Sequence, residues 1–386
     1  ANVVSFSLLG AASLAPTVVN FGATFDSTPR VFVLPTNEEP EATSIRILSV
    51  STTGFTMAQV QPDASPAPAS SMQVDYIAAI DGIHALDDNT IVDVGTLPVS
   101  TTIGLGGGTY TPLTFAYEDF PTSPVTLLQI QTTNSEGALD PTTISVPWLA
   151  VAAVAVDALT MNVSLERAQV TDGGTVSSET IAYMAVTNTA LGNFDPVEGG
   201  TTISFETLRV TNIEGVDNGC DTNNFVGTYS SSPIVGASQS ARNGSDGGWA
   251  KRCSLSSTTI GLQIDEDSDA DAERAHIAED VDILVFSETF AGDFAQPELV
   301  INYNPDVATQ TPTGVVEYSI LVTNTGAARA SIIELETTIN DFAGLKMDTY
   351  LGLPFNLVPG GVDPEVVLGT PLYTEDNGAD SFGYSP

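Results

Sequence analysis

The feature that most limits the fold of this chain is a regular alternation of apolar and polar residues. It runs through segments such as 44–50 (SIRILSV), 54–60 (GFTMAQV), 72–78 (MQVDYIA) and 317–322 (EYSILV). Successive side chains of a β-strand point to opposite faces of a sheet, so a period of two indicates strands. Clusters of Pro, Gly, Asn and Asp separate these segments at roughly 8–12-residue spacing, as in β-sandwiches. The sequence therefore predicts an all-β chain of tandem antiparallel β-sandwich domains.

One sequence pattern occurs three times. An aromatic residue is followed four residues later by Pro, then by an apolar strand, a Thr-rich turn with its strand, and a further strand. The three copies of the aromatic-to-Pro segment are 25–29, 120–124 and 229–233. A repeat of roughly 100 residues is the size of one small β domain. We therefore predict three related β units at residues 1–105, 106–198 and 199–295.

The remaining segment, 296–386, has a different character. Its apolar strand 315–322 runs into the turn 323–326 (TNTG), and a second alternating segment follows at 332–339. This pattern predicts a separate immunoglobulin-like sandwich.

The charge balance excludes two classes of partner. Lys and Arg total 10 and Asp and Glu total 48, which gives a formal net charge of −38. Nucleic-acid binding needs a cationic surface that displaces counterions, and an anionic membrane surface makes the same demand. We therefore predict neither partner. The acidity is explained by solubility in salt or, at particular clusters, by calcium binding.

The two cysteines and the N-terminus point to an oxidising compartment. Cys220 and Cys253 lie 33 residues apart, and the sequence has no CxxC pair that would indicate a metal site. We predict that they form a disulfide. The chain begins with Ala1 rather than Met, which indicates a processed, secreted form. The most apolar run, 148–156, has nine residues and is too short to insert into a membrane.

Several segments resemble known families. Phe-x-x-x-Pro-x-Val-x-Val at 25–33, followed by TTGF at 52–55, resembles the H-type lectin domain. The match is closest to versions strung together in large, pilus-associated surface proteins of Gram-negative bacteria, which segments 243–253 and 265–276 also resemble. Segment 318–326 (YSILVTNTG) is similar to an adhesin-type immunoglobulin-like repeat. The resemblance implies six-stranded sandwiches that often trimerise, with a sugar cleft between neighbouring subunits. It also implies an extracellular, cell-surface location.

The sequence carries no recognised catalytic pattern. Nucleophilic catalysis needs a base close to a Ser or Cys, and the chain has only two histidines, His84 and His276. It has no Gly-x-Ser-x-Gly elbow and no HExxH motif. We interpret His84 as structural and predict that the protein is not an enzyme and has no cofactor, with calcium left open.

The densest run of acidic residues lies at 265–273. Carboxylates spaced by two resemble the start of an EF-hand loop, but Ala272 and Ala278 occupy the positions of its Gly and its last Glu. Two interpretations stay open. The run is either a solvated loop partly neutralised by Arg274 and His276, or a calcium site of another type. The candidate ligands are Asp267, Asp269, Asp271 and Glu273.

These features predict a non-enzymatic extracellular structural or adhesive protein, such as a subunit of a surface fibre or pilus-associated assembly. Its partners would be copies of itself or other surface proteins. The alternative is a carbohydrate-binding lectin, with glycans as partners.

Assembly could use the apolar N-terminal segment. The resemblance implies one further strand for the last domain, which leaves a sheet edge that a neighbouring chain could fill. The segment suited to donation contains Val3, Val4, Phe6, Leu8 and Leu9. The other interpretation is that this segment is the first strand of its own domain.

Overall fold

The described residues form strands joined by turns. The computed structural model describes residues 3–12, 16–36, 42–60, 72–86, 90–135, 149–167, 176–196, 201–266, 273–292, 294, 299–305, 318–324, 335–340, 371–376 and 379–384. They include one 3₁₀ turn, η1 (Val216–Asn218), and otherwise only strands and irregular segments. Apart from the parallel pair of β9 with β14, the named strands pair antiparallel. The predicted all-β fold class is confirmed. Among these residues no helix is long and apolar enough to cross a bilayer.

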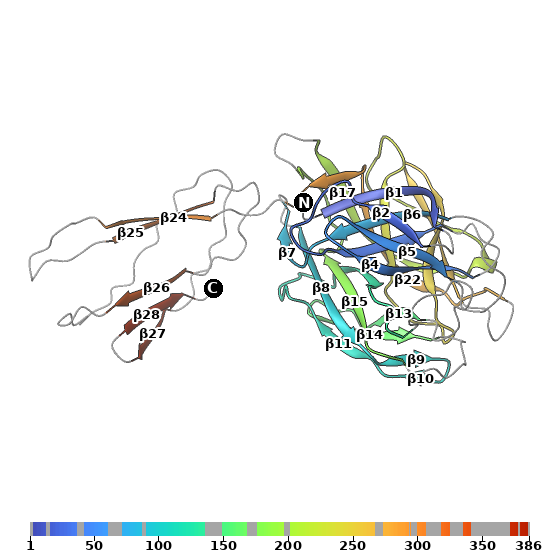
Figure 1. Cartoon of the computed structure of the whole chain (residues 1–386), viewed down its shortest axis with the longest axis horizontal. Coiled ribbons are helices and arrows are strands. Elements are labelled where there is room, and N and C mark those ends of the chain that lie inside the picture. Colours follow the sequence, from blue (N-terminus) through green and yellow to red (C-terminus); the bar gives the residue numbers. More distant parts are fainter. Residues whose placement is uncertain are drawn as a thin grey trace, which may run out of the picture. The chain divides into compact units, whose positions relative to one another are not determined.

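The chain divides into two compact units, 1–295 and 296–386. The first contains three β-sandwiches, each made of two sheets that enclose one hydrophobic core. Figure 1 shows their strands, coloured from blue to orange. The first sandwich contains β1 (Val3–Ala12), β2 (Thr17–Asn20), β3 (Arg30–Pro35), β4 (Ser44–Val50), β5 (Gly54–Val60) and β6 (Met72–Ala79). The second contains β8 (Ile91–Val99), β9 (Thr102–Gly104), β10 (Gly107–Gly108), β11 (Thr111–Thr114), β12 (Val125–Ile130), β13 (Ala150–Val154), β14 (Thr160–Glu166) and β15 (Glu179–Val186). The third contains β17 (Ile203–Ile213), β18 (Asp221–Asn224), β19 (Ile234–Gln239), β20 (Trp249–Leu255), β21 (Thr259–Asp265) and β22 (Glu279–Phe286).

The second sandwich begins earlier than the sequence division placed it. β8 pairs along its length with β15, so residues 91–99 belong to the second sandwich rather than to a unit ending at 105. The predicted boundary between 105 and 106 falls within a glycine cluster. This cluster forms instead the tight turn between β9 and β10, where Gly107 has a φ of 85°.

Three short strands link the sandwiches into a closed ring. β7 (Gly82–Ala85) follows the first sandwich and pairs with β8 of the second. β16 (Leu191–Phe194) follows the second and pairs with β17 of the third. β23 (Phe290–Gly292) follows the third and pairs with β1 of the first. Each sandwich therefore extends the sheet of the next, and the last returns to the first.

The equivalent strands β3, β12 and β19 contact one another where the sandwiches meet. Each sandwich has its own hydrophobic core, and a fourth apolar cluster combines residues of all three. In that cluster Phe32 pairs with Ile77 and Leu127 pairs with Met184, whereas the equivalent position in β19 is Gly236. A Cβ on Gly236 would lie 2.8 Å from both the Ile77 and Leu127 side chains. The glycine therefore makes room for large neighbours, as close packing requires.

One hydrogen bond recurs at all three junctions. A backbone N–H near the start of β3, β12 or β19 donates to a side-chain oxygen of the next sandwich in the ring. The pairs are Val31 with Gln131 (3.1 Å), Thr126 with Asp282 (2.7 Å) and Val235 with Asp75 (3.2 Å). These bonds are buried, so each satisfies a backbone donor that would otherwise be costly.

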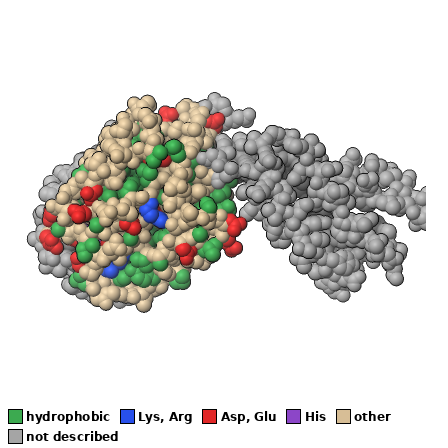
Figure 2. Space-filling model, turned by 180° about the vertical axis from the view of Figure 1, so that it is seen from behind, with side chains coloured by type: hydrophobic (Ala, Val, Ile, Leu, Met, Phe, Trp, Pro, Cys, Tyr) green, Lys and Arg blue, Asp and Glu red, His purple; other side chains and the backbone are tan. Residues whose placement is uncertain are grey.

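Cationic side chains concentrate at the same junctions. Residues 1–295 contain eight Lys and Arg residues, and five of them contact a neighbouring sandwich. The contacts are Arg46 to the Thr132 carbonyl, Arg209 to Ser123 and the Pro124 carbonyl, Arg242 to Glu166, Lys251 to Thr43, and Arg252 to Asp75. Figure 2 shows how few cations remain on one face, where acidic and apolar side chains are spread among neutral polar ones.

The N-terminal strand is paired on both edges within its own chain. β1 lies between β23 and β6, with Val3 opposite both Gly292 and Ala79. In this structure the segment is the first strand of its own domain, the second of the two interpretations. Donation of Val3–Leu9 to another chain would require removing it from this position.

The second unit is described by two small antiparallel sheets. β24 (Leu299–Pro305) pairs with β25 (Tyr318–Asn324), and β28 (Ala379–Tyr384) lies between β26 (Leu335–Asn340) and β27 (Pro371–Asp376).

Substitution of a junction cation should be far more damaging than substitution of a surface one. Arg252 and Asp75 are buried, at 3% and 0% side-chain exposure, so Arg252→Ala should lower the free energy of unfolding by about 3–5 kcal/mol. The matched control is Arg30→Ala, because the Arg30–Asp81 pair is 25% and 45% exposed and should contribute less than about 1 kcal/mol. Urea denaturation measures the free energy of unfolding of both variants. Equal losses of stability would contradict the conclusion that the buried junction pair contributes more than the exposed pair.

Candidate functional site

The calcium ligands expected from the acidic run are only partly within the described residues. Asp267, Asp269 and Asp271 lie outside them, and Glu273 is exposed. The calcium interpretation therefore stays a prediction.

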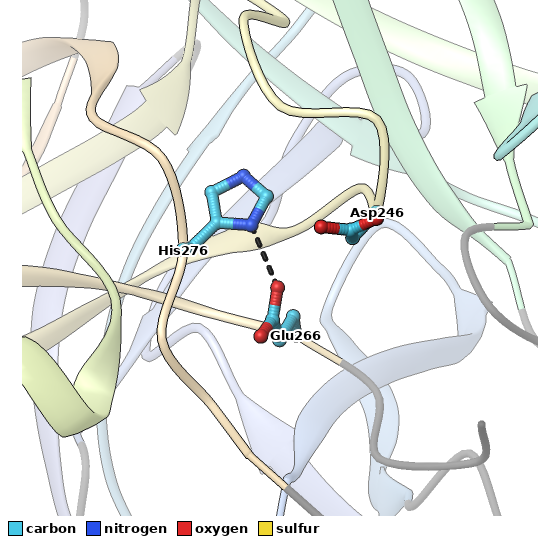
Figure 3. Close-up of side chains that lie close together, drawn as sticks. All are labelled: Asp246, Glu266 and His276. Carbon is cyan, nitrogen blue, oxygen red and sulfur yellow. Dashed lines mark hydrogen bonds and ion pairs between the residues drawn. The ribbon is translucent and has the colours of Figure 1, made fainter. Parts of the chain in front are cut away.

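A different cluster of metal-ligating side chains does come together. Asp246, Glu266 and His276 each offer a ligand atom, and these atoms all lie within 4.8 Å of one another (Figure 3). Glu266 directly follows β21, His276 precedes β22, and Asp246 lies in the loop between β19 and β20. Glu266 and His276 are buried, whereas Asp246 is half-buried. Three separate segments of the third sandwich thus converge on one point.

Two carboxylates hold the imidazole from opposite sides. His276 Nδ1 lies 2.7 Å from Glu266 Oε2, and Nε2 lies 3.2 Å from Glu279 Oε1. Glu279 also accepts hydrogen bonds from the backbone N–H groups of Asn243 and Gly244, at 2.8–2.9 Å. Glu279 therefore fixes both the ring and the loop that carries Asp246.

The loop backbone lies against the histidine ring. A Cβ on Gly244 would lie 2.7–2.8 Å from ring atoms of His276, so only glycine permits this approach. Gly247, further along the loop, has a φ of 74°, a conformation that also favours glycine. The glycine-rich segment therefore serves to place Asp246 beside the buried pair.

The carboxylates determine the protonation of His276. Burial by itself would lower its pKa, but hydrogen bonds to Glu266 and Glu279, together with their charges, raise the pKa to about 9. Burial raises the pKa of Glu266, and the charges of Asp246 and Glu273 act in the same direction, against the hydrogen bond from His276. His276 is thus an imidazolium at neutral pH, with both nitrogens occupied.

His84 lies in another environment. Its Nε2 is 3.2 Å from the Ile80 carbonyl, and its ring packs on Phe294 with centroids 5.2 Å apart. Burial lowers its pKa. Within the described part of the chain, no hydrogen bond joins either histidine to a Ser or Cys side chain.

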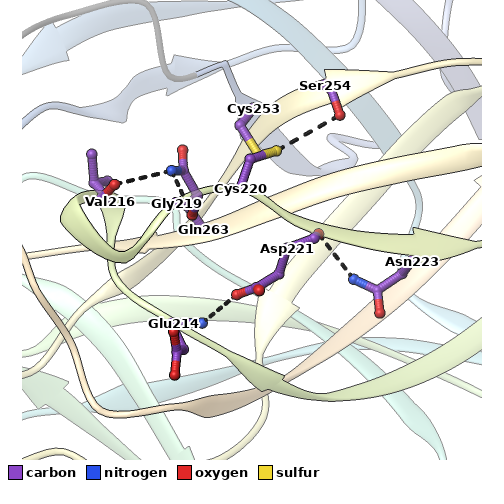
Figure 4. Close-up of a disulfide and its surroundings, with 9 residues drawn as sticks. All are labelled: Glu214, Val216, Gly219, Cys220, Asp221, Asn223, Cys253, Ser254 and Gln263. Atoms are coloured by element: carbon purple, nitrogen blue, oxygen red, sulfur yellow. Dashed lines mark hydrogen bonds between the residues drawn. A yellow bond between two sulfur atoms is a disulfide. The ribbon is translucent and has the colours of Figure 1, made fainter.

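The predicted disulfide between Cys220 and Cys253 is confirmed (Figure 4). Cys220 precedes β18 and Cys253 lies in a bulge of β20, while β21 runs between these two strands. The bridge therefore passes over β21 at Gly261. A Cβ there would overlap the Cys220 sulfur and the Ser254 hydroxyl, and it would lie 3.0 Å from the Cys253 sulfur.

Two hollows lie where sandwiches meet. One, of about 70 Å³, is lined by equivalent positions of all three, including Val33, Leu128 and Ala237. The other, of about 280 Å³, lies between the second and third sandwiches and includes Arg209 and Asp280 in its lining.

Comparison with known proteins gives no match to this chain among family models, curated proteins or solved structures.

Substitution of Gly261 should conflict specifically with the disulfide. Gly261→Ala should destabilise the oxidised protein by about 1–3 kcal/mol, the usual cost of overpacking. In a Cys220→Ala/Cys253→Ala chain the same substitution should cost at least about 1 kcal/mol less. The matched control is Gly106→Ala, where no atom lies within 4 Å of the added Cβ. Thermal unfolding of the wild type, Gly261→Ala, the double cysteine variant and the triple variant tests this prediction. Additive losses of stability would contradict it.

The raised pKa of His276 predicts a pH-dependent stability. A group whose pKa is higher in the folded state than its ordinary value of about 6.5 stabilises the fold most below that value. The contribution, up to about 3 kcal/mol, should be lost as the pH rises through about 9. Urea denaturation between pH 6 and 10 measures the loss. His276→Gln should remove this part of the pH dependence, and an unchanged profile would contradict the assignment.

Proposed function

We propose that this protein is a non-enzymatic extracellular structural or adhesive protein, a subunit of a surface fibre or pilus-associated assembly. The observation that carries the proposal is the closed ring of three sandwiches followed in tandem by a further β unit. Such a ring fixes its own ends, because β1 and β23 pair with each other. The closed ring therefore suits a rigid building block that contacts its surroundings through loops rather than through a catalytic cleft.

Three further observations support this role. The Cys220–Cys253 bridge suits an oxidising, extracellular compartment, since disulfides are rare where thiols are kept reduced. The net charge of −38 favours solubility and disfavours nucleic acid as a partner. The described histidines are engaged by carboxylates or by a backbone carbonyl, arrangements that suit structural roles.

A carbohydrate-binding lectin is the second candidate. The hollow between the second and third sandwiches favours it, because Arg209, Ser240 and Asp280 present polar groups there that suit a hydroxyl-rich ligand. Glycans would then be the partners, in place of copies of the chain or other surface proteins.

Imaging and glycan binding separate the two candidates. The purified full chain, concentrated and viewed by negative stain, should form ordered polymers. A chain lacking residues 1–12 loses the strand between β23 and β6, so it should fail to assemble. A monodisperse full-length monomer would contradict the fibre proposal, and selective binding of that monomer on a glycan array would favour the lectin.

A further inference from the structure

We propose that Asp246, Glu266 and His276 form a binding site for a divalent first-row transition-metal ion such as zinc. This site uses none of the candidate calcium ligands Asp267, Asp269, Asp271 and Glu273, and it does not rest on the proposed role in a surface assembly. Zinc sites use imidazole nitrogen and carboxylate oxygen at about 2.0–2.2 Å. The three side chains supply one nitrogen and two carboxylate groups.

The geometry needs only small movements. Ligand atoms around a tetrahedral zinc ion are separated by roughly 3.3–3.5 Å, as the bond lengths require. Here all three lie within 4.8 Å of one another, and Glu266 Oε2 lies 2.7 Å from His276 Nδ1. Figure 3 shows both carboxylates turned toward the imidazole. Because Asp246 is half-buried, it lies on the side from which an ion and a completing water molecule can enter.

The histidine is held in the orientation that a metal ligand needs. Its Nε2 faces Glu279, which leaves Nδ1 directed at Glu266. A histidine ligand that donates its other N–H to a carboxylate is the usual arrangement in zinc sites, since the carboxylate fixes the tautomer and the ring. A metal ion at Nδ1 would displace the Nδ1 proton to water, while the Nε2–H would stay hydrogen-bonded to Glu279. The backbone of Asn243 and Gly244 holds Glu279 in turn.

The charge and donor types select the class of ion. The carboxylates of Asp246, Glu266 and Glu279 surround one imidazole, so the cluster gathers negative charge that a divalent cation would reduce. Calcium prefers six to eight oxygen ligands, whereas a nitrogen with two carboxylates suits zinc and its neighbours. The site should therefore discriminate against calcium.

Metal titration of the untagged full chain tests the proposal. After treatment with a chelator and dialysis, cobalt(II) should bind at one ion per chain with visible absorption bands that differ from those of the hydrated ion. Zinc should displace it, and excess calcium should not. Zinc should also raise the melting temperature, as a ligand of the folded state does.

Two variants locate the ion. Asp246→Asn removes one ligand at a half-buried loop position and should weaken zinc affinity at least about tenfold, as loss of a ligand contact does. Glu273→Gln removes the same charge from an exposed side chain that acts on Glu266 through its charge alone, and should change the affinity by less than about twofold. Wild-type affinity in Asp246→Asn would overturn the proposal. An equal loss in Glu273→Gln would also overturn it, by placing the ion in the acidic run. Circular dichroism of each variant confirms its fold, and polymer formation plays no part in this readout.

Discussion

The buried contacts of a few cations at the junctions between sandwiches are the interaction on which the ring depends. The acidic side chains of a chain with a net charge of −38 repel one another. Each cation at a junction offsets part of that repulsion between neighbouring sandwiches. Arg252 meets Asp75 where the third sandwich joins the first, and Arg242 meets Glu166 where the second joins the third. Removal from water strengthens the attraction within each pair and makes loss of either partner costly. These buried contacts therefore act together with the apolar cluster that the three sandwiches share.

The candidate metal site is positioned by one of these junctions. Arg242 lies in the loop between β19 and β20, and its side chain binds Glu166, the Gly104 carbonyl and the Ser245 carbonyl. Ser245 directly precedes Asp246, so the contact that joins two sandwiches also fixes the loop residue of the cluster. The site thus rests on the junction between the second and third sandwiches, and a change at that junction should alter the geometry of the cluster.

The features that could be predicted from the sequence are local or repeated. The alternation of apolar and polar residues predicted the strands because that signal is local. The disulfide could be predicted because two cysteines allow only one pairing within the chain. Ring closure could not be predicted, since β1 and β23 lie at opposite ends of the unit and carry no mutual pattern. The cluster was missed for a related reason. Glu266 belonged to the acidic run and His276 followed it, but Asp246 comes from a loop that only folding brings near.

The three sandwiches share one framework but use it differently. Strands β5, β14 and β21 end at equivalent positions, which hold Val60, Glu166 and Asp265. The first is apolar, and the second binds the junction residue Arg242. The third, Asp265, forms ion pairs with Lys251 and Arg274 of its own sandwich. It also accepts a hydrogen bond from the Thr43 N–H of the first sandwich. Glu266 follows Asp265 directly, so the most heavily supported of the three strand ends is also the one that carries a cluster residue. Because neighbouring contacts already fix this backbone, the third sandwich can hold a buried carboxylate–imidazole cluster directly after it.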